Sequence, residues 1–169
     1  MRIYGIPGKM VRAIAAIYSG FECAVVEGNV TSDWFMIKSG VKQGCMMSGF
    51  LFLLCLDWVM RKATGDKRRG IRWNFATVLE DLDFADDIAP LSSKFNDLHE
   101  KTRRLAGKAA RVGLKLNARK CKTLRTESVS SREKIVVDGK EVDDVEEFTY
   151  LGVIVDKEGG GSKDIMHRL

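Results

Sequence analysis

The spacing of hydrophobic residues predicts two helices in the first third of the chain. Between residues 7 and 19, apolar side chains recur every three or four positions, which is the period of one helix face. Pro7 suits the first turn of this helix and Gly20 its end. Residues 47–63 are apolar on almost every side. A helix without a polar face is expected to be buried, so we predict that this helix lies inside the fold.

Turn residues predict strands on both sides of the second helix. Residues 21–40 are interpreted as two strands around a turn at Gly28–Asn29. After the helix, residues 76–84 and 88–91 are predicted as two short strands, with Ala85-Asp86-Asp87 at the turn between them. Because this pattern pairs neighbouring strands through short turns, it indicates antiparallel hairpins.

The second half of the chain predicts one more helix and further strands. Residues 96–112 return to helical spacing, with an apolar stripe that includes Leu105 and Ala109. Five basic side chains of this helix are expected largely outside the stripe: Lys101, Arg103, Arg104, Lys108 and Arg111. An Asp138–Gly139 turn follows, and then the strand-like run FTYLGVIVD. The last dozen residues are interpreted as a loop and the start of a helix.

This order of elements predicts an α+β domain with a mainly antiparallel sheet and helices packed on one face. The length of 169 residues is enough for one domain with a hydrophobic core, and the sequence has no internal repeat.

Composition narrows the class of protein. The chain has 28 Lys and Arg against 23 Asp and Glu, and this net charge of +5 favours a polyanionic partner. The four cysteines form no CxxC pair and only two histidines occur, which argues against a zinc site and for reduced, buried thiols. Asp57 and Arg61 interrupt the longest apolar run, so we expect no membrane span. The N-terminus has no long apolar core typical of a signal peptide, which predicts an intracellular protein.

One acidic segment stands out against this basic background. LEDLDFADDIAPLSS holds five carboxylates in eight positions, from Glu80 to Asp87, together with residues that favour burial. Phe84, Asp86 and Ile88 share the two-residue period of a strand, so a geometry that buries Phe84 is expected to point Asp86 the same way. Glu80, Asp81 and Asp83 are expected to face solvent or to pair with Lys or Arg.

Two adjacent carboxylates on a tight hairpin suit a divalent metal ion. Mg²⁺ prefers oxygen ligands and usually takes one or two carboxylates, which leaves positions for water and substrate phosphate. Two such ions can stabilise both oxygens of an in-line displacement. Asp also favours turns on its own account, so from Asp86-Asp87 alone a plain turn is the simpler interpretation.

Several motifs in order decide between these interpretations. They are YGIPGKMVRAIAAIYSG, SGVKQGCMMSGFLFLLCLDWVM, LDFADDIAPLS, GLKLNARKCKTL and EEFTYLGVIVD. Together they resemble the palm of reverse transcriptases, specifically those of non-LTR (LINE-type) retrotransposons, and they cover nearly the entire chain. The resemblance implies an RNA-directed DNA polymerase that transfers nucleotides by two-metal chemistry, with an RNA template, a DNA primer and dNTP as partners.

The resemblance also implies roles for individual residues. Asp86 and Asp87 would bind the catalytic Mg²⁺ ions, with Mn²⁺ as a substitute, and Phe84 would pack beneath them. Gln43 and Gly44 would lie against the template and the incoming nucleotide, and Lys42 is expected to bind template or nucleotide with them. Lys120 would contact or protonate the departing pyrophosphate, with Lys122 as the alternate. Residues 101–125 would hold the nucleic-acid backbone through Arg103, Arg104, Lys108 and Lys122.

The sequence departs from the family pattern in one chemically important way. The family uses a third Asp on an earlier strand, which would lie upstream of Met1, so residues 1–169 are interpreted as a partial domain: part of the fingers plus the palm, truncated at the N-terminus and without the thumb. Neither Asp33 nor Asp57 has the context to replace the missing Asp. We therefore expect the isolated chain to be inactive, and we expect self-association through an exposed sheet edge.

Two alternatives remain open at this point. The chain could be a catalytically dead remnant that only binds nucleic acid, or the product of a pseudogene. Because the family works at chromosomal DNA, the resemblance implies a nuclear location, which the basic KRRGIR segment supports weakly.

Overall fold

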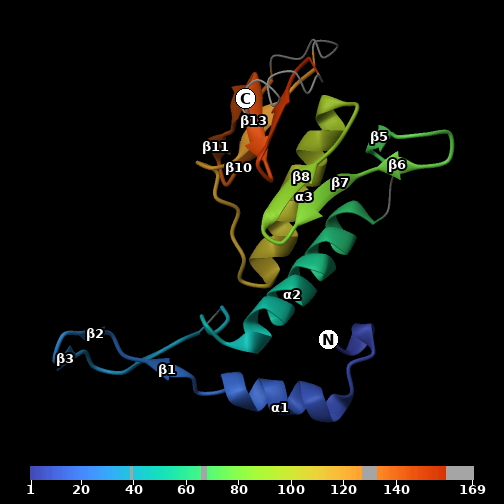
Figure 1. Cartoon of the computed structure of the whole chain (residues 1–169). Coiled ribbons are helices and arrows are strands. Elements are labelled where there is room, and N and C mark those ends of the chain that lie inside the picture. The colour runs from blue at the N-terminus through green and yellow to red at the C-terminus, as the bar shows by residue number, and fades with distance from the viewer. Residues whose placement is uncertain (39, 66–67, 127–132, 159–169) are drawn as a thin grey trace. The chain divides into compact units, whose positions relative to one another are not determined.

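The computed structural model describes residues 1–38, 40–65, 68–126 and 133–158, within two compact units, Met1–Leu54 and Cys55–Leu169. Helices and short strands alternate along the chain, so the predicted α+β class is confirmed (Figure 1). No helix in the described ranges has the length and hydropathy needed to span a bilayer. Beyond Glu158, the predicted C-terminal loop and helix start lie outside the described residues.

The first unit begins with a helix, followed by two pairs of short strands, one lying between the strands of the other along the chain. A short 3₁₀ turn, Arg2–Tyr4, precedes α1, Gly8–Tyr18, which agrees with the prediction for residues 7–19. The four strands that follow are all antiparallel in their pairs: β1 (Glu22–Cys23) pairs with β4 (Phe35–Met36), and β2 (Val26–Glu27) pairs with β3 (Val30–Thr31). Gly28 has a φ of 59°, which places the predicted turn between β2 and β3 and explains the need for glycine there.

Helix α2, Met46–Thr64, contains the boundary between the two units and confirms the helix predicted for residues 47–63. Its predicted full burial is wrong. In its second half, Leu56, Val59, Met60 and Ala63 are buried at helical spacing. Two apolar side chains in its first half are open instead, since Phe50 is 55% exposed and Leu53 is 50% exposed, whereas Leu51 between them is buried.

The second unit contains helix α3, Phe95–Arg111, and five strand pairs. Four pairs are antiparallel: β5 (Ile71–Arg72) with β6 (Val78–Leu79), β7 (Asp81–Phe84) with β8 (Asp87–Pro90), β10 (Val136–Val137) with β11 (Lys140–Glu141), and β13 (Glu147–Tyr150) with β14 (Val153–Asp156). The fifth is parallel: β9 (Lys122–Leu124) with β12 (Asp143–Val145). The mainly antiparallel prediction is confirmed, but the described strands pair two by two where one sheet was predicted.

The core of this unit forms where α3 meets the β10–β11 hairpin. Ile135, Val137 and Val142 are almost fully buried, while Val136 is 39% exposed, which is the alternation of a strand with one covered face. Partly buried side chains complete the cluster: Phe95, Leu98, Leu116, Ala118 and Cys121. The predicted helix stripe is confirmed at Leu105 and Ala109, both buried.

Two segments that were each predicted as one strand contain two strands in the structure. The run FTYLGVIVD, predicted as one strand, folds back on itself at Leu151–Gly152, where both residues have positive φ. Such a two-residue turn matches the twist of a hairpin. The run 76–84 is divided into β6, which pairs with β5, and β7, which pairs with β8, and the Glu80 between them also bonds to Arg69 and Lys101.

Candidate active site

The acidic hairpin β7–β8 turns more tightly than the sequence suggested. Ala85 and Asp86 form a two-residue turn, in which Ala85 has a φ of 52°, and Asp87 is already the first residue of β8, opposite Phe84. Residues that face each other across an antiparallel pair share one face of it. Phe84 therefore lies on the same face as Asp87, and Asp83 lies with Ile88 on the other. The predicted sharing of a face by Phe84, Asp86 and Ile88 is wrong.

Asp86 and Asp87 lie at the exposed tip of this hairpin. The Asp86 carboxylate makes no hydrogen bond or ion pair within the described part of the chain, so its oxygens are open to a ligand. Phe84 is 64% exposed, and its predicted packing beneath the two acids is therefore wrong in this structure.

Tyr150 approaches the tip from the neighbouring hairpin. Its hydroxyl lies 3.4 Å from the carbonyl oxygen of Asp87, a long contact in which the hydroxyl is the donor. Burial raises the pKa of Tyr150, and the nearby carboxylates of Asp87 and Asp83 raise it further. Tyr150 lies in the EEFTYLGVIVD motif, but it was not among the predicted site residues.

The base of the same hairpin is tied to α3, which lies along it in Figure 1. Lys101 of α3 forms an ion pair with Glu80, so the expected pairing of Glu80 with a basic residue is confirmed. Burial raises the pKa of the Glu80 carboxyl, but the hydrogen bond and charge of Lys101, with the N–H groups of Gly70 and Arg69, outweigh it and leave the pKa below its ordinary value. The predicted position of Lys101 outside the buried stripe is wrong, because only 2% of this residue is exposed.

Asp81, at the start of β7, has a different environment. Burial raises its pKa, and the negative charges of Asp83 and Glu80 add to that rise, while Lys101 opposes it. The five acids of the segment thus fall into a paired acid at the base, a half-buried acid above it and exposed acids towards the tip.

The donors at the tip fit a hard divalent cation in kind. Carboxylate oxygens are the ligands that Mg²⁺ prefers, and one or two of them with water and phosphate complete its shell. The described ranges contain no group of three His, Cys, Asp or Glu side chains placed to hold a metal ion. Asp86 and Asp87 would therefore hold an ion only together with ligands from water, substrate or elsewhere.

The Lys42-Gln43-Gly44 loop belongs to the first unit. Gly44 has a φ of 78°, so this turn requires glycine, and Gln43 is exposed. The carbonyl of Lys42 accepts the hydroxyl of Ser48 and the N–H of Cys45, which ties the loop to the start of α2. The ammonium of Lys42 lies 4.1 Å from the centre of the Phe21 ring, a cation–π distance that draws it back onto its own unit.

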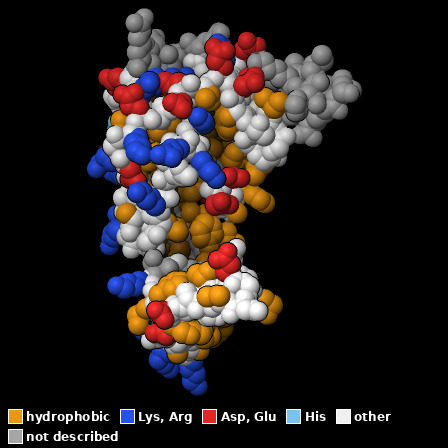
Figure 2. All heavy atoms as spheres, turned by 90° about the vertical axis from the view of Figure 1, so that its left-hand side faces the viewer, with side chains coloured by type: hydrophobic (Ala, Val, Ile, Leu, Met, Phe, Trp, Pro, Cys, Tyr) orange, Lys and Arg blue, Asp and Glu red, His pale blue; other side chains and the backbone are white. Residues whose placement is uncertain are grey.

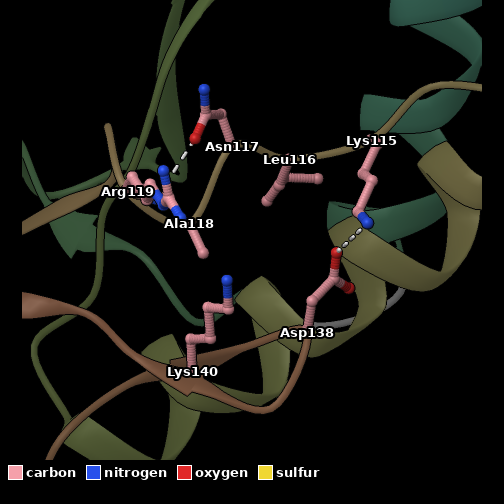
Figure 3. Close-up of a pocket in the computed structure, with 7 residues that line it drawn as sticks. All are labelled: Lys115, Leu116, Asn117, Ala118, Arg119, Asp138 and Lys140. Carbon is pink, nitrogen blue, oxygen red and sulfur yellow. Dashed lines mark hydrogen bonds and ion pairs between the residues drawn. The ribbon is translucent and has the colours of Figure 1, made fainter.

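Lys120 ends a tight turn that Asn117 begins, and its N–H donates to the Asn117 carbonyl at 2.9 Å. Its side chain is exposed and has no acidic partner among the described residues. Lys122, the alternate, pairs with Asp143 at 3.0 Å. The same turn borders an open pocket of about 420 Å³, which Figure 3 shows with Arg119 and Lys140 beside it.

The cations expected to hold nucleic acid differ in how far they are already neutralised. Arg103 and Arg104 both pair with Glu100, at 2.9 and 2.8 Å. Lys108 has no acidic partner in the described ranges. Figure 2 shows the wider pattern, in which Lys and Arg side chains are interspersed with Asp and Glu over the face in view.

Comparison with known proteins places the chain in a family. Residues 3–155 match the reverse transcriptase (RNA-dependent DNA polymerase) family. The chain is 27% identical over 168 residues to the retrovirus-related Pol polyprotein from type-1 retrotransposable element R2 of Popillia japonica, which covers 94% of this chain and 28% of that protein. It is also 28% identical over 166 residues to the retrovirus-related Pol polyprotein from type-2 retrotransposable element R2DM of Drosophila melanogaster. This alignment covers 90% of this chain and 15% of the Drosophila protein.

The chain thus spans less than a third of the length of these relatives. The match extends over both units, from the first helix into the last described strand, and includes the motifs on which the sequence resemblance rested except the final Asp156. The chain belongs to the reverse transcriptase (RNA-dependent DNA polymerase) family, and its similarity to R2 polyproteins confirms the resemblance to reverse transcriptases of non-LTR retrotransposons.

Proposed function

We propose that this chain is part of the polymerase palm of a retrotransposon reverse transcriptase, with Asp86 and Asp87 as the metal-binding acids. The observation that supports the proposal most is the position of these acids: two exposed carboxylates at the tip of a two-residue turn, in a segment of a reverse transcriptase domain. Mg²⁺, or Mn²⁺ in its place, would neutralise the charge that develops on the transferring phosphoryl group.

The remaining residues would position the nucleic acid and the nucleotide. Gln43 and Gly44 would lie against the template and the incoming dNTP, because a glycine turn lets a ligand approach the backbone closely. Lys120, exposed and without an acidic partner in the described ranges, would contact or protonate the departing pyrophosphate.

The backbone of RNA template and DNA primer would lie against cations that no acid neutralises. Lys108 meets this description, and so do Arg119 and Lys140 at the open pocket, within the described part of the chain. Arg103 and Arg104 would have to exchange Glu100 for phosphate. Binding of this kind is salt-dependent and tolerant of sequence.

We also propose that the chain by itself extends primers slowly or not at all. The family resemblance implies three carboxylates, and within the described ranges no third acid groups with Asp86 and Asp87. Loss of such preorganised charge stabilisation costs a few kcal/mol, roughly 100- to 1,000-fold in rate. A remnant that only binds nucleic acid in the nucleus is the second candidate, favoured by the same incomplete set of acids. Exposed apolar side chains such as Trp34 and Phe35 favour self-association of either form.

Primer extension on an RNA template tests the proposal. The protein should carry this chain together with a segment that supplies the third carboxylate. Asp86→Ala should then reduce extension by about 100-fold or more. Asp33→Ala, at an exposed position of the first unit, is the matched control and should leave the rate unchanged. Equal extension by wild-type protein and Asp86→Ala would show that the metal assignment is wrong.

A further inference from the structure

A buried lysine lies beneath the acidic hairpin. The side chain of Lys101 is 3% exposed, although its neighbours at helical spacing on α3, Leu105 and Leu98, are apolar. Burying an ammonium group is costly unless its donors are paired. An apolar residue would fill the same position without that cost, so the partners of Lys101 indicate what the charge is for.

The ammonium group of Lys101 binds one end of the hairpin through two hydrogen bonds and one ion pair. The Lys101 Nζ donates to the carbonyl of Glu80 at 2.9 Å and to the carbonyl of Leu91 at 2.6 Å, and it forms an ion pair with the Glu80 carboxylate. A lysine ammonium has three N–H groups and no acceptor, so two of its donors are taken by backbone carbonyls, and the Glu80 carboxylate balances its charge.

These acceptors come from both strands. Glu80 directly precedes β7 and Leu91 directly follows β8, and the N–H of Leu91 donates to the Glu80 carbonyl at 2.8 Å. One ammonium group therefore joins the two strands at the end opposite the Ala85–Asp86 turn. Within the described residues β7 and β8 pair only with each other, so no further strand fixes this hairpin.

A second set of bonds holds Glu80 from outside. The N–H of Arg69 donates to Glu80 Oε1 at 2.9 Å, and the carbonyl of Arg69 accepts the hydroxyl of Ser92 at 2.7 Å. The Arg69 guanidinium lies 3.4 Å from Asp97 of α3. Arg69, before the hairpin, is thus bonded to Glu80, to Ser92 after the hairpin and to Asp97 of α3.

We propose that Lys101 is a positioning residue: with Glu80 it fixes the base of the β7–β8 hairpin on α3 and so sets the position of Asp86 and Asp87. The link to metal binding rests on the proposed polymerase function. The fixing of the hairpin does not, because it follows from the bonds at its base.

Amide hydrogen exchange of the 169-residue chain tests this directly. Lys101→Met removes the ammonium group that joins two carbonyls and a carboxylate at the base of the hairpin. It should accelerate exchange of the β7–β8 amides by about tenfold or more, with little change in β13–β14. Lys101→Arg keeps the charge and should restore part of the protection. Lys94→Met removes an exposed lysine next to the same helix and should change nothing.

Hairpin exchange that is unchanged in Lys101→Met, or increased equally across the whole unit, would overturn the proposal. If Lys101→Met does not fold, Glu80→Gln decides the question. It removes the charge but keeps the shape, and it should accelerate hairpin exchange by about threefold or more. Unchanged exchange in that variant would overturn the proposal as well.

Binding of Mn²⁺ then separates the two proposals. Lys101→Met should weaken binding about tenfold while both acids at the tip remain, and Asp86→Ala should abolish it. If Asp86→Ala binds Mn²⁺ as the wild-type chain does, the proposed polymerase function fails. In that case the exchange measurement alone still supports or overturns the role of Lys101 in the hairpin.

Discussion

Glu80, Asp81 and Asp86 lie within seven residues of one another, yet each carboxylate has a different environment. Glu80 is paired with a buried lysine, Asp81 is half-buried beside other acids, and Asp86 is exposed at a turn. These environments correspond to different tasks, because a paired acid stabilises the fold, whereas an open acid can accept a ligand.

Asp81 should make the chain less stable at neutral pH. Its pKa is raised in the folded state, so the folded chain is favoured when this group is protonated and loses stability as pH rises through that pKa. Asp81→Asn should therefore be more stable than wild type at pH 7, and the difference should shrink as pH falls towards 3.8. Urea unfolding at pH 7 and near pH 4 measures it, with Asp33→Asn as control. A variant that is less stable than wild type at pH 7 would contradict the pKa direction.

Some of these environments could be predicted from sequence and some could not. The turn position of Asp86 followed from its neighbours, and the basic partner of Glu80 was expected. Lys101 was predicted outside the buried stripe because helical periodicity treats every lysine as polar. Its ammonium group is buried, and it donates to the carbonyl oxygens of Glu80 and Leu91. Phe84 was misplaced because a turn one residue shorter than expected changed which face it shares with its neighbours.

At the scale of elements, tight turns decide the fold of the second unit. The hairpins β7–β8, β10–β11 and β13–β14 each turn through two residues that include at least one positive φ. The acidic tip and Tyr150 are both placed by such turns, so an altered turn would move a proposed site residue.

Gly152 and Gly107 should respond in opposite ways to the same substitution. Gly152→Ala forces a side chain into a φ of 80° and should destabilise the unit by about 1–2 kcal/mol, although an added Cβ would meet no neighbour. Gly107 lies in α3 with equally open space, so Gly107→Ala should stabilise by about 0.5–1 kcal/mol through helix propensity. Thermal unfolding of the two variants gives both signs. Stabilisation by Gly152→Ala would show that the β13–β14 turn differs from the one described.

Helices were the elements that sequence predicted best. Helices α1 and α3 have the three-to-four-residue spacing of one helix face, and α2 was predicted from a long apolar run. The ends of these three described helices differ from the prediction by one residue. Strands were harder, because hydrophobic runs such as FTYLGVIVD do not reveal where a chain reverses. Only the weak preference of Gly152 for positive φ marked that turn.

At the scale of the whole molecule, the net charge of +5 hides a surface on which many charges cancel. Ion pairs neutralise Lys122 and Lys134, and two arginines of α3, Arg103 and Arg104, share the single carboxylate of Glu100. The cations left over, including Arg119, Lys120 and Lys140, are therefore better placed to bind phosphate than the total charge suggests.

Salt dependence of RNA binding should identify these cations. Each phosphate contact that is lost should lower the slope of log affinity against log salt by about 0.7 for a single strand. Arg119→Gln and Lys140→Gln should each show this change. Lys134→Gln removes the same charge from a lysine that Glu141 already neutralises, so it should change the slope least. Equal slopes for the three variants would mean that only net charge matters.

A titration of the chain with Mn²⁺ tests whether the tip of the acidic hairpin binds a divalent metal ion. Water-proton relaxation reports bound Mn²⁺ whether or not the chain is active. Wild type and Asp33→Ala should bind equally, whereas Asp86→Ala should abolish binding and Asp87→Ala should weaken it by about tenfold or more. Binding that is the same in all four proteins would show that Asp86 and Asp87 do not bind the ion.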